Sequence, residues 1–336
     1  ASRGFSRWYT THHMSSQQCR PGEPAPGFIG RFGEVVDQRR GSAFQELRSE
    51  NLLNRLSGAG MPFGWTVNPF RGCEVGCRYC YARPTHEYLG HADPSEFEER
   101  IYVKRAGDRK LDVSLLRARE SGQEIAIGTA TDPYQPAEGR FGITRHVLEA
   151  MTRVPGLRVG ITTKSTGILR DREILGRLAR TAELWVNVSL ISLDADLLRS
   201  VEPRAPRPDL RLGAVRTLAG DGIRTRVFLM PVLPLLTDGE AGLRELLAAA
   251  LHAGAREVIS QALFLRTEMT WRFFLDFVAA EFPWALSRYR ALYPRPGNAP
   301  TAYREEIDRR VGRLAAEVGF PARTREERVR AEAPAR

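Results

Sequence analysis

The chain has 336 residues, of which 42% are hydrophobic, and carries a formal net charge of +10. A chain of this length can bury a substantial core, and one α/β barrel with terminal extensions accounts for it. The longest apolar candidate, Phe228 to Leu236, falls far short of the roughly 20 residues of a membrane span, which argues against a membrane partner. The chain contains only four cysteines, so we expect a soluble protein of a reducing, cytoplasmic compartment.

The positive charge suggests an acidic partner such as a nucleic acid. Lysine occurs only three times, at Lys104, Lys110 and Lys164, and the other 47 basic residues are arginines spread among acidic residues. No aromatic and basic motif typical of an RNA- or DNA-binding module accompanies them. A nucleic-acid substrate is therefore one hypothesis, which the charge supports only modestly.

The N-terminal part of the chain predicts an arm followed by a helix. Residues 1–42 are rich in Ser, Thr, Gly, Pro and Arg and poor in acidic residues, which predicts a flexible arm. His12, His13 and Cys19 lie in this arm without a ligand pattern. Leucines at near-helical spacing in Phe44 to Leu56 then predict a helix that covers the bottom or edge of a barrel.

The first predicted strand, Gly64 to Phe70, leads into Cys73, Cys77 and Cys80 at C-x3-C-x2-C spacing. Three thiolates from one loop can each hold one iron of a 4Fe-4S cube, leaving the fourth iron open to an external molecule. An open iron indicates catalysis rather than storage. The alternative is a structural zinc site with His86 as its fourth ligand. A disulfide is a weaker alternative, because the chain is poor in cysteine.

After the cysteines, apolar strand-like runs alternate with amphipathic helical segments. Together with the first strand, this alternation gives six strands, which predicts parallel pairing through right-handed crossovers. Barrel enzymes place their chemistry at the carboxyl ends of the strands, where the cysteine loop is expected. The remaining predicted strands are Glu124 to Thr131, Leu157 to Lys164, Leu184 to Ser192, Arg224 to Leu233 and Glu257 to Leu265, with helices around Thr144 to Arg153 and at Ala241 to His252.

Two further helices are predicted after the last strand, at Thr270 to Arg290 and at Thr301 to Val318. A segment rich in Pro and Gly separates them. The organisation that follows is a barrel over residues 43–268, a helical extension over 269–320 and a charged tail over 321–336. We expect the extension to close the barrel or to contact substrate.

Several segments resemble the radical S-adenosylmethionine (SAM) superfamily, and in particular the spore photoproduct lyase-related branch with its uncharacterised bacterial members. The matching stretches, which follow the family's order, are TVNPFRGCEVGCRYCYARPTHEYLG, GTATDPYQPAEG, TTKS, VSLIS and MPVLPLLTD. The resemblance implies a partial (β/α)6 barrel of the TIM type with N- and C-terminal helical extensions. It also implies a 4Fe-4S cluster and SAM as cofactors. In that superfamily a reduced flavodoxin or ferredoxin-type donor supplies the electron that cleaves SAM to a 5′-deoxyadenosyl radical, which abstracts hydrogen from a substrate.

The resemblance also places SAM contacts at the strand ends. By position, Tyr79 matches the residue that contacts the adenine, Thr131 and Asp132 match contacts of the amino group, and Lys164 matches the partner of the carboxylate. Ser189 matches a serine that hydrogen-bonds SAM. The structural alternatives are packing for Tyr79, turn initiation for Asp132 and a backbone contact for Ser189. Other polar residues near these positions are interpreted as a buried network that orders the loops, and they are Tyr81, Arg83, His86, Glu87, Tyr88, Glu202 and Arg204. The alternatives are that Arg204 holds a phosphate or carboxylate of the substrate and that His86 moves protons.

One position departs from spore photoproduct lyase, which carries a hydrogen-donating cysteine where this chain has Thr129. Because an O–H bond is far stronger than a thiol S–H bond, Thr129 cannot return a hydrogen atom to a product radical. Three hypotheses follow. The chain is a radical SAM enzyme with an unidentified substrate, a DNA repair lyase or nucleic-acid-modifying enzyme, or a non-catalytic protein stabilised by zinc or an iron–sulfur cluster.

Overall fold

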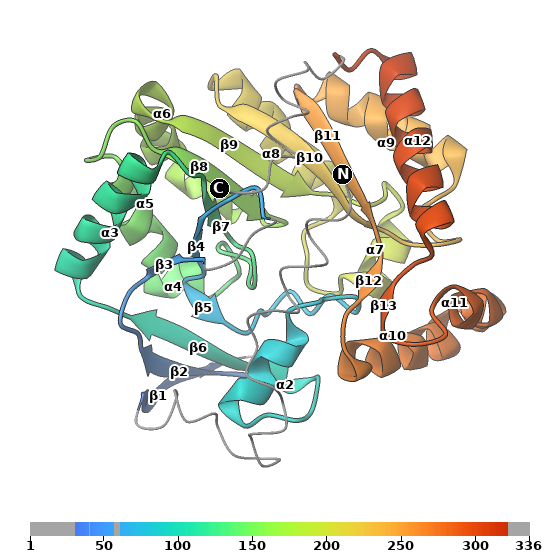
Figure 1. Cartoon of the computed structure of the whole chain (residues 1–336), viewed down its shortest axis with the longest axis horizontal. Helices are drawn as coiled ribbons and strands as arrows, with labels where there is room; N and C mark the ends of the chain where they lie inside the picture. The colour runs from blue at the N-terminus through green and yellow to red at the C-terminus, as the bar shows by residue number, and fades with distance from the viewer. Residues whose placement is uncertain (1–30, 40, 57–60, 322–336) are drawn as a thin grey trace.

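The computed structural model of the protein describes residues 31–39, 41–56 and 61–321, and Figure 1 shows its α/β architecture. A main sheet and a smaller sheet lie side by side, and helices pack on the main sheet. One large apolar cluster runs through strands and helices of the barrel and includes Ile127, Val159 and Val186. In this described part of the chain, no helix is both long and apolar enough to cross a membrane.

The main sheet contains six parallel strands, in agreement with the predicted partial barrel. In spatial order they are β11 (Glu257–Ala262), β10 (Arg224–Val232), β9 (Glu183–Ser189), β8 (Arg158–Thr163), β7 (Ile125–Ile127) and β4 (Trp65–Val67). A seventh described strand, β3 (Leu53–Arg55), pairs antiparallel with β4 at one edge. The carboxyl ends of the parallel strands therefore meet at one rim of the sheet.

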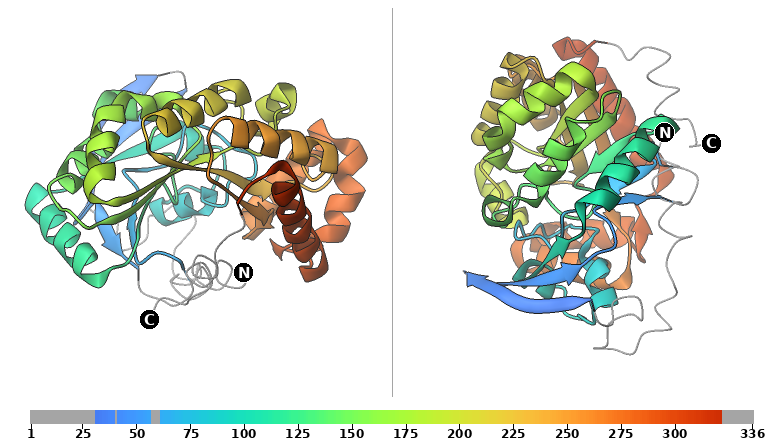
Figure 2. Two further views of the ribbon diagram at one scale, coloured as in Figure 1. Left: turned by 90° about the horizontal axis from the view of Figure 1, so that it is seen from above. Right: turned by 90° about the vertical axis from the view of Figure 1, so that its left-hand side faces the viewer.

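The crossover helices cover one side of this curved sheet, as the green to orange helices in Figure 2 show. Their buried residues recur at helical spacing, as Ile174, Leu175 and Leu178 do in α6. The long crossover helices are α3 (Asp108–Ser121), α5 (Ile143–Met151), α6 (Arg172–Thr181), α8 (Pro208–Gly220) and α9 (Glu240–His252). The short segments between strands are α2 (Glu96–Glu99), η3 (Arg83–Leu89), α4 (Glu138–Phe141), η4 (Thr166–Asp171) and α7 (Ala195–Val201).

The smaller sheet, in the order β1–β2–β6–β5, was not predicted from the sequence. Its strands are β1 (Phe32–Arg39), β2 (Ser42–Arg48), β6 (Arg100–Arg105) and β5 (Phe70–Arg71). Part of the predicted arm is therefore strand β1, while residues 1–30, with His12, His13 and Cys19, lie outside the described residues. Residues 322–336, almost all of the predicted tail, also lie outside them.

The helix predicted over Phe44 to Leu56 is wrong, since this segment forms most of β2 and all of β3. The four leucines of the segment imitate helical spacing, but β2 is held by pairing with two distant strands. It runs parallel to β6 and antiparallel to β1. Such pairing is set by tertiary contacts and overrides local propensity.

The C-terminal extension follows the prediction closely. Helix α12 (Thr301–Val318) has the predicted bounds, and it buries Ile307, Val311 and Leu314 while contacting α9 and β11. The helix predicted over Thr270 to Arg290 is interrupted at Pro283, because proline lacks the N–H that a helix interior needs. It forms α10 (Glu268–Glu281), η5 (Pro283–Ala285) and α11 (Leu286–Leu292), and the short strands β12 (Phe264–Leu265) and β13 (Gly297–Asn298) pair beside them.

Lys104 of β6 is a buried amine whose replacement is expected to stabilise the fold. Its side chain is 8% exposed, and burial, with a smaller effect of Arg71, lowers the pKa of Lys104 to about 7. Among the described residues no carboxylate pairs with it. The folded pKa lies below the ordinary value of 10.5, so the unfolded chain binds more protons between these values.

The destabilisation that Lys104 causes should consequently shrink as pH rises from about 7 to about 10.5. We expect Lys104→Met to increase the free energy of unfolding by roughly 1–3 kcal/mol at pH 7, and this gain should shrink as pH rises. Urea unfolding over that pH range measures it, with Lys110→Met at an exposed site of α3 as the matched control. A gain that does not change with pH would contradict the interpretation.

Candidate functional site

The cysteine loop starts directly after β5 and lies at the rim where the parallel strands end. Cys73 and Cys77 are buried, Cys80 is half-buried, and none of the three forms a disulfide. Gly72 has φ +81°, and a Cβ at this position would lie 2.6 Å from the carbonyl oxygen of Arg100. Only glycine fits this conformation and this close approach, so the loop can pass tightly against α2 and β6.

Hydrogen bonds from separate segments fix the loop. The Cys73 amide donates to the Phe97 carbonyl over 2.9 Å, and the Arg78 amide donates to the Val201 carbonyl over 2.9 Å. The Glu74 amide donates to Gln135 Oε1 over 2.8 Å, so the turn after β7 also holds the loop. The loop conformation is thus determined by the protein scaffold on several sides.

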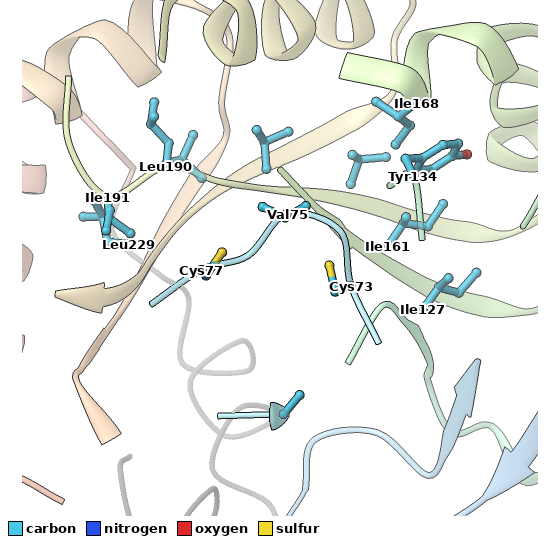
Figure 3. Packing of buried hydrophobic residues seen from close by; sticks show 14 of the residues in the cluster. Cys73, Val75, Cys77, Ile127, Tyr134, Ile161, Ile168, Leu190, Ile191 and Leu229 are labelled. Carbon is cyan, nitrogen blue, oxygen red and sulfur yellow. The ribbon is translucent and has the colours of Figure 1, made fainter. Parts of the chain in front are cut away.

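Figure 3 shows Val75 at the apex of the loop, between Cys73 and Cys77. Val75 is 3% exposed and belongs to the main apolar core. The other side chains drawn in this view come from strands β7, β8 and β10 and from the segments that follow β7, β8 and β9, and they include Ile127, Tyr134, Ile161, Ile168, Leu190, Ile191 and Leu229. Apolar packing at the apex therefore anchors the two buried cysteines.

The thiols lie in an environment that disfavours free thiolates. Burial raises the pKa of Cys73 well above its ordinary value, and it raises that of Cys77 to about 12. A bound metal centre supplies the positive charge that such thiolates require, so binding would release the thiol protons. The Asp132 amide also approaches Cys73 Sγ at 3.4 Å, as a hydrogen-bond donor to a cluster ligand does. The donor set therefore fits an iron–sulfur cluster.

The zinc alternative depends on His86, and the structure gives this residue another role. Its Nε2 is 2.8 Å from the Arg100 carbonyl oxygen, to which it donates, and its ring packs edge-on against Phe97. Burial lowers the pKa of His86 to about 3, so the ring is neutral at pH 7. In the described part of the chain, no three His, Cys, Asp or Glu side chains surround a common metal position. A cube does not require one, because each cysteine binds a different iron.

Thr131 and Asp132 are both engaged in ordering the loops. The Thr131 hydroxyl donates to the Gly72 carbonyl over 2.7 Å. The Asp132 carboxylate accepts from the Tyr134 amide, the Thr163 hydroxyl and the Lys164 amide over 2.9, 2.6 and 2.7 Å. The turn-initiating role considered for Asp132 is thus present in the structure, and its carboxylate also ties the ends of β7 and β8 together.

Lys164 lies at the end of β8 with its Nζ 5.7 Å from the centre of the Tyr79 ring. No carboxylate or other acceptor among the described residues forms a hydrogen bond or ion pair with this ammonium. Burial lowers the pKa of Lys164, but the neighbouring Cys77 and Glu202 outweigh burial and raise it above the ordinary value. A cation next to the cysteine loop is therefore available to an external anion.

A buried polar network holds the Tyr79 hydroxyl. The Tyr79 hydroxyl donates to Glu202, and Glu202 forms an ion pair with Arg211 Nη2 at 2.5 Å. Arg211 Nη1 also donates to the Ser189 carbonyl over 3.1 Å, while the Ser189 hydroxyl has no hydrogen-bond partner among the described residues. The structure thus brings Tyr79, Lys164 and Ser189 to the same rim as the cysteines.

Several residues of this site were not predicted from the sequence. Arg211 lies on helix α8 and Gln135 in the turn after β7, and the fold brings them to the network and to the loop. Near these residues, the Tyr81 hydroxyl donates to the Thr129 carbonyl. Asn68 Nδ2 in turn donates to the Thr129 hydroxyl over 2.9 Å.

Comparison with known proteins identifies the family. Residues 67–247 match the family model described as the Radical SAM superfamily, and the chain belongs to this superfamily. It is therefore a radical SAM enzyme by class, as the resemblance of its motifs predicted. An uncharacterized protein of Mycobacterium tuberculosis, Rv2578c, is 37% identical over 296 residues, covering 87% of this chain and 86% of that protein. The uncharacterized protein MJ0683 of Methanocaldococcus jannaschii is 27% identical over 176 residues, covering 52% of this chain and 63% of that protein.

Solved structures with a similar fold include spore photoproduct lyase. The complex of that enzyme with dinucleoside spore photoproduct has a TM-score of 0.57 at 16% identity, covering 76% of this chain and 74% of that chain. A double mutant of the same enzyme with bound AdoMet and dinucleoside spore photoproduct also has a TM-score of 0.57, at 15% identity and with the same coverage. At this level of identity, the similarity establishes the fold.

Proposed function

We propose that Cys73, Cys77 and Cys80 bind a 4Fe-4S cluster whose fourth iron takes SAM, and that the enzyme abstracts hydrogen from an unidentified substrate. The observation that carries this proposal is the placement of a rigid three-thiol loop beside the ammonium of Lys164, which has no anionic partner among the described residues. When bound and reduced, the cluster supplies the electron that cleaves SAM to a 5′-deoxyadenosyl radical. The chain itself binds and orients the cofactor and excludes water.

Each strand-end residue has a part in this proposal. Lys164 would pair with the SAM carboxylate, and Asp132 would fix the backbone that carries Lys164. The Thr131 hydroxyl would hold the Gly72 carbonyl, and Thr131 and Asp132 would contact the amino group of SAM. Tyr79 would provide backbone contacts to the adenine, and the Ser189 hydroxyl would be free to hydrogen-bond SAM.

Anaerobic reconstitution with iron and sulfide tests the proposal. The expected result is about four irons per chain and formation of 5′-deoxyadenosine from SAM under dithionite. Retention of zinc without any SAM cleavage would instead support the non-catalytic binding protein.

In the cell, we propose that a reduced flavodoxin or ferredoxin of the cytoplasm supplies the electron.

Lys164→Met is expected to weaken SAM binding without loss of the cluster. Removing one charge-assisted contact costs roughly 1.5–3 kcal/mol, which corresponds to about a 10- to 100-fold increase in the Kd for SAM. Equilibrium dialysis against reconstituted protein measures this Kd, and Lys110→Met is the control with the same loss of charge at an exposed site. An unchanged Kd together with a full complement of iron would rule out the assigned role of Lys164.

A nucleic-acid substrate is the second candidate, as a repair lyase or a modifying enzyme. It is favoured by the net charge of +10 and by the fold that the chain shares with spore photoproduct lyase complexed with dinucleoside spore photoproduct. Because Thr129 replaces the hydrogen-donating cysteine expected for that lyase, direct lesion reversal would need a different donor. Separate incubations with deuterated oligonucleotides and with deuterated small metabolites test the candidate. Deuterium transfer from the oligonucleotides into 5′-deoxyadenosine would support it, and transfer only from the small metabolites would oppose it.

A further inference from the structure

The C-terminal extension reaches the cysteine loop through Arg83, a residue that follows the third cysteine. Arg83 is 1% exposed, which is rare for an arginine and implies that its guanidinium donors find partners within the protein. Its Nε and Nη2 donate to the Cys77 carbonyl over 3.3 and 2.9 Å. The same guanidinium therefore grips the backbone of a predicted cluster ligand with two donors.

The other contacts of Arg83 tie the loop to its neighbours. Nη1 donates to the Pro94 carbonyl over 2.6 Å, and Nη2 forms an ion pair with Glu98 Oε2 at 2.5 Å. Glu98 belongs to α2 and is 7% exposed, so the ion pair is shielded from water. A guanidinium can make all of these contacts at once because its donors form a planar fork, which a lysine ammonium cannot reproduce.

Helix α10 of the C-terminal extension packs against the planar face of the Arg83 guanidinium. The Arg83 guanidinium carbon lies 4.3 Å from the centre of the Phe273 ring, which is stacking distance for a cation over an aromatic face. One turn further along α10, the Phe277 ring lies 5.9 Å from the guanidinium carbon of Arg78, which also approaches Glu98 at 3.7 Å. Two arginines that flank the third cysteine thus meet two phenylalanines of one helix.

We propose that Arg83 is a positioning residue for the cluster loop and that Phe273 holds Arg83 in place, so that the C-terminal extension is part of the iron–sulfur site. Arg83 touches no reacting atom in this arrangement. It fixes the Cys77 carbonyl and hence the direction of the Cys77 side chain. The inference rests on the proposed function for its cluster readouts, and on the geometry of the loop alone for its thiol readout.

The first test uses the metal-free protein and does not depend on any cluster. Arg83→Lys keeps the charge but removes the fork, and we expect iodoacetamide to alkylate Cys77 about 10-fold faster relative to Cys80 than in the parent. Phe273→Leu keeps an apolar side chain but removes the ring face, and a smaller increase of roughly fivefold is expected. Arg100→Lys is the matched control, since the Arg100 side chain lies in the same region, is more than half exposed and pairs with Glu96.

The second test uses reconstituted protein. We expect Arg83→Lys to lose iron to a chelator about 10-fold faster than the parent and to show an altered electron paramagnetic resonance spectrum of the reduced cluster. If Arg83→Lys and Phe273→Leu, both with parent-like circular dichroism, keep the parent's Cys77 alkylation ratio, the inference is wrong. If the parent itself binds no cluster, the proposed function fails, and the alkylation ratio still decides the inference.

Discussion

Replacing Cys77 with alanine is expected to abolish the formation of 5′-deoxyadenosine from SAM. The proposed cluster would lose one of its three thiolate ligands, and this thiol is buried beside the apolar core. Loss of an outer partner of a metal ligand already costs about 10- to 100-fold in affinity or activity, so loss of the ligand itself should cost more. Iron content and SAM cleavage after anaerobic reconstitution provide the measurement.

The chain offers a matched control in its fourth cysteine. Cys19 lies outside the three-cysteine motif, so Cys19→Ala should retain about four irons and full SAM cleavage. If Cys77→Ala kept its iron, or if Cys19→Ala lost it, the assignment of the three ligands would have to be abandoned. Cys77→Ala should also be compared with the parent by circular dichroism, because Cys77 is part of the core.

Arg211→Met is expected to lower the free energy of unfolding by about 3–5 kcal/mol. Arg211 and Glu202 are each 1% exposed, and their ion pair supports the Tyr79 hydroxyl and the end of β9. Removing the guanidinium leaves the Glu202 carboxylate buried with less compensation, which is far more costly than losing an exposed pair. Urea unfolding at pH 7 measures the change.

The control for this prediction is an exposed pair near the start of the same helix. Arg207→Met breaks the ion pair of Arg207 with Asp209, whose side chains are 64% and 59% exposed. Exposed pairs contribute about 0–1 kcal/mol, so this variant should unfold close to the parent. Equal losses for Arg211→Met and Arg207→Met would show that burial of the network does not matter to stability.

The elements that the sequence predicted well are those with strong local signals. Helix α12 shows apolar residues at helical spacing after a proline, and its observed bounds, Thr301–Val318, match the prediction. The six parallel strands appear as short apolar runs between helical segments, although β7 is limited to Ile125–Ile127. The cysteine loop was found because its spacing is itself the chemical signal.

The elements that were missed depend on partners far away in the chain. Strand β2 pairs with β6 across more than fifty residues, and neither strand alternates clearly between polar and apolar residues. At the site, position alone suggested Asp132 and Lys164, but it could not show that the Asp132 carboxylate binds the Lys164 amide. Likewise, nothing in the sequence near Arg211 indicates that it pairs with Glu202.

The packing of α12 against β11 bears on whether another chain can pair with the main sheet. Strand β11 is the last strand of the main sheet on its side, and an uncovered edge offers backbone groups to which another chain can add a strand. The opposite edge is the three-residue strand β3, which is too short to be a good template. We therefore expect a chain truncated before Thr301 to expose its longer edge and to aggregate more than the full chain, which light scattering measures.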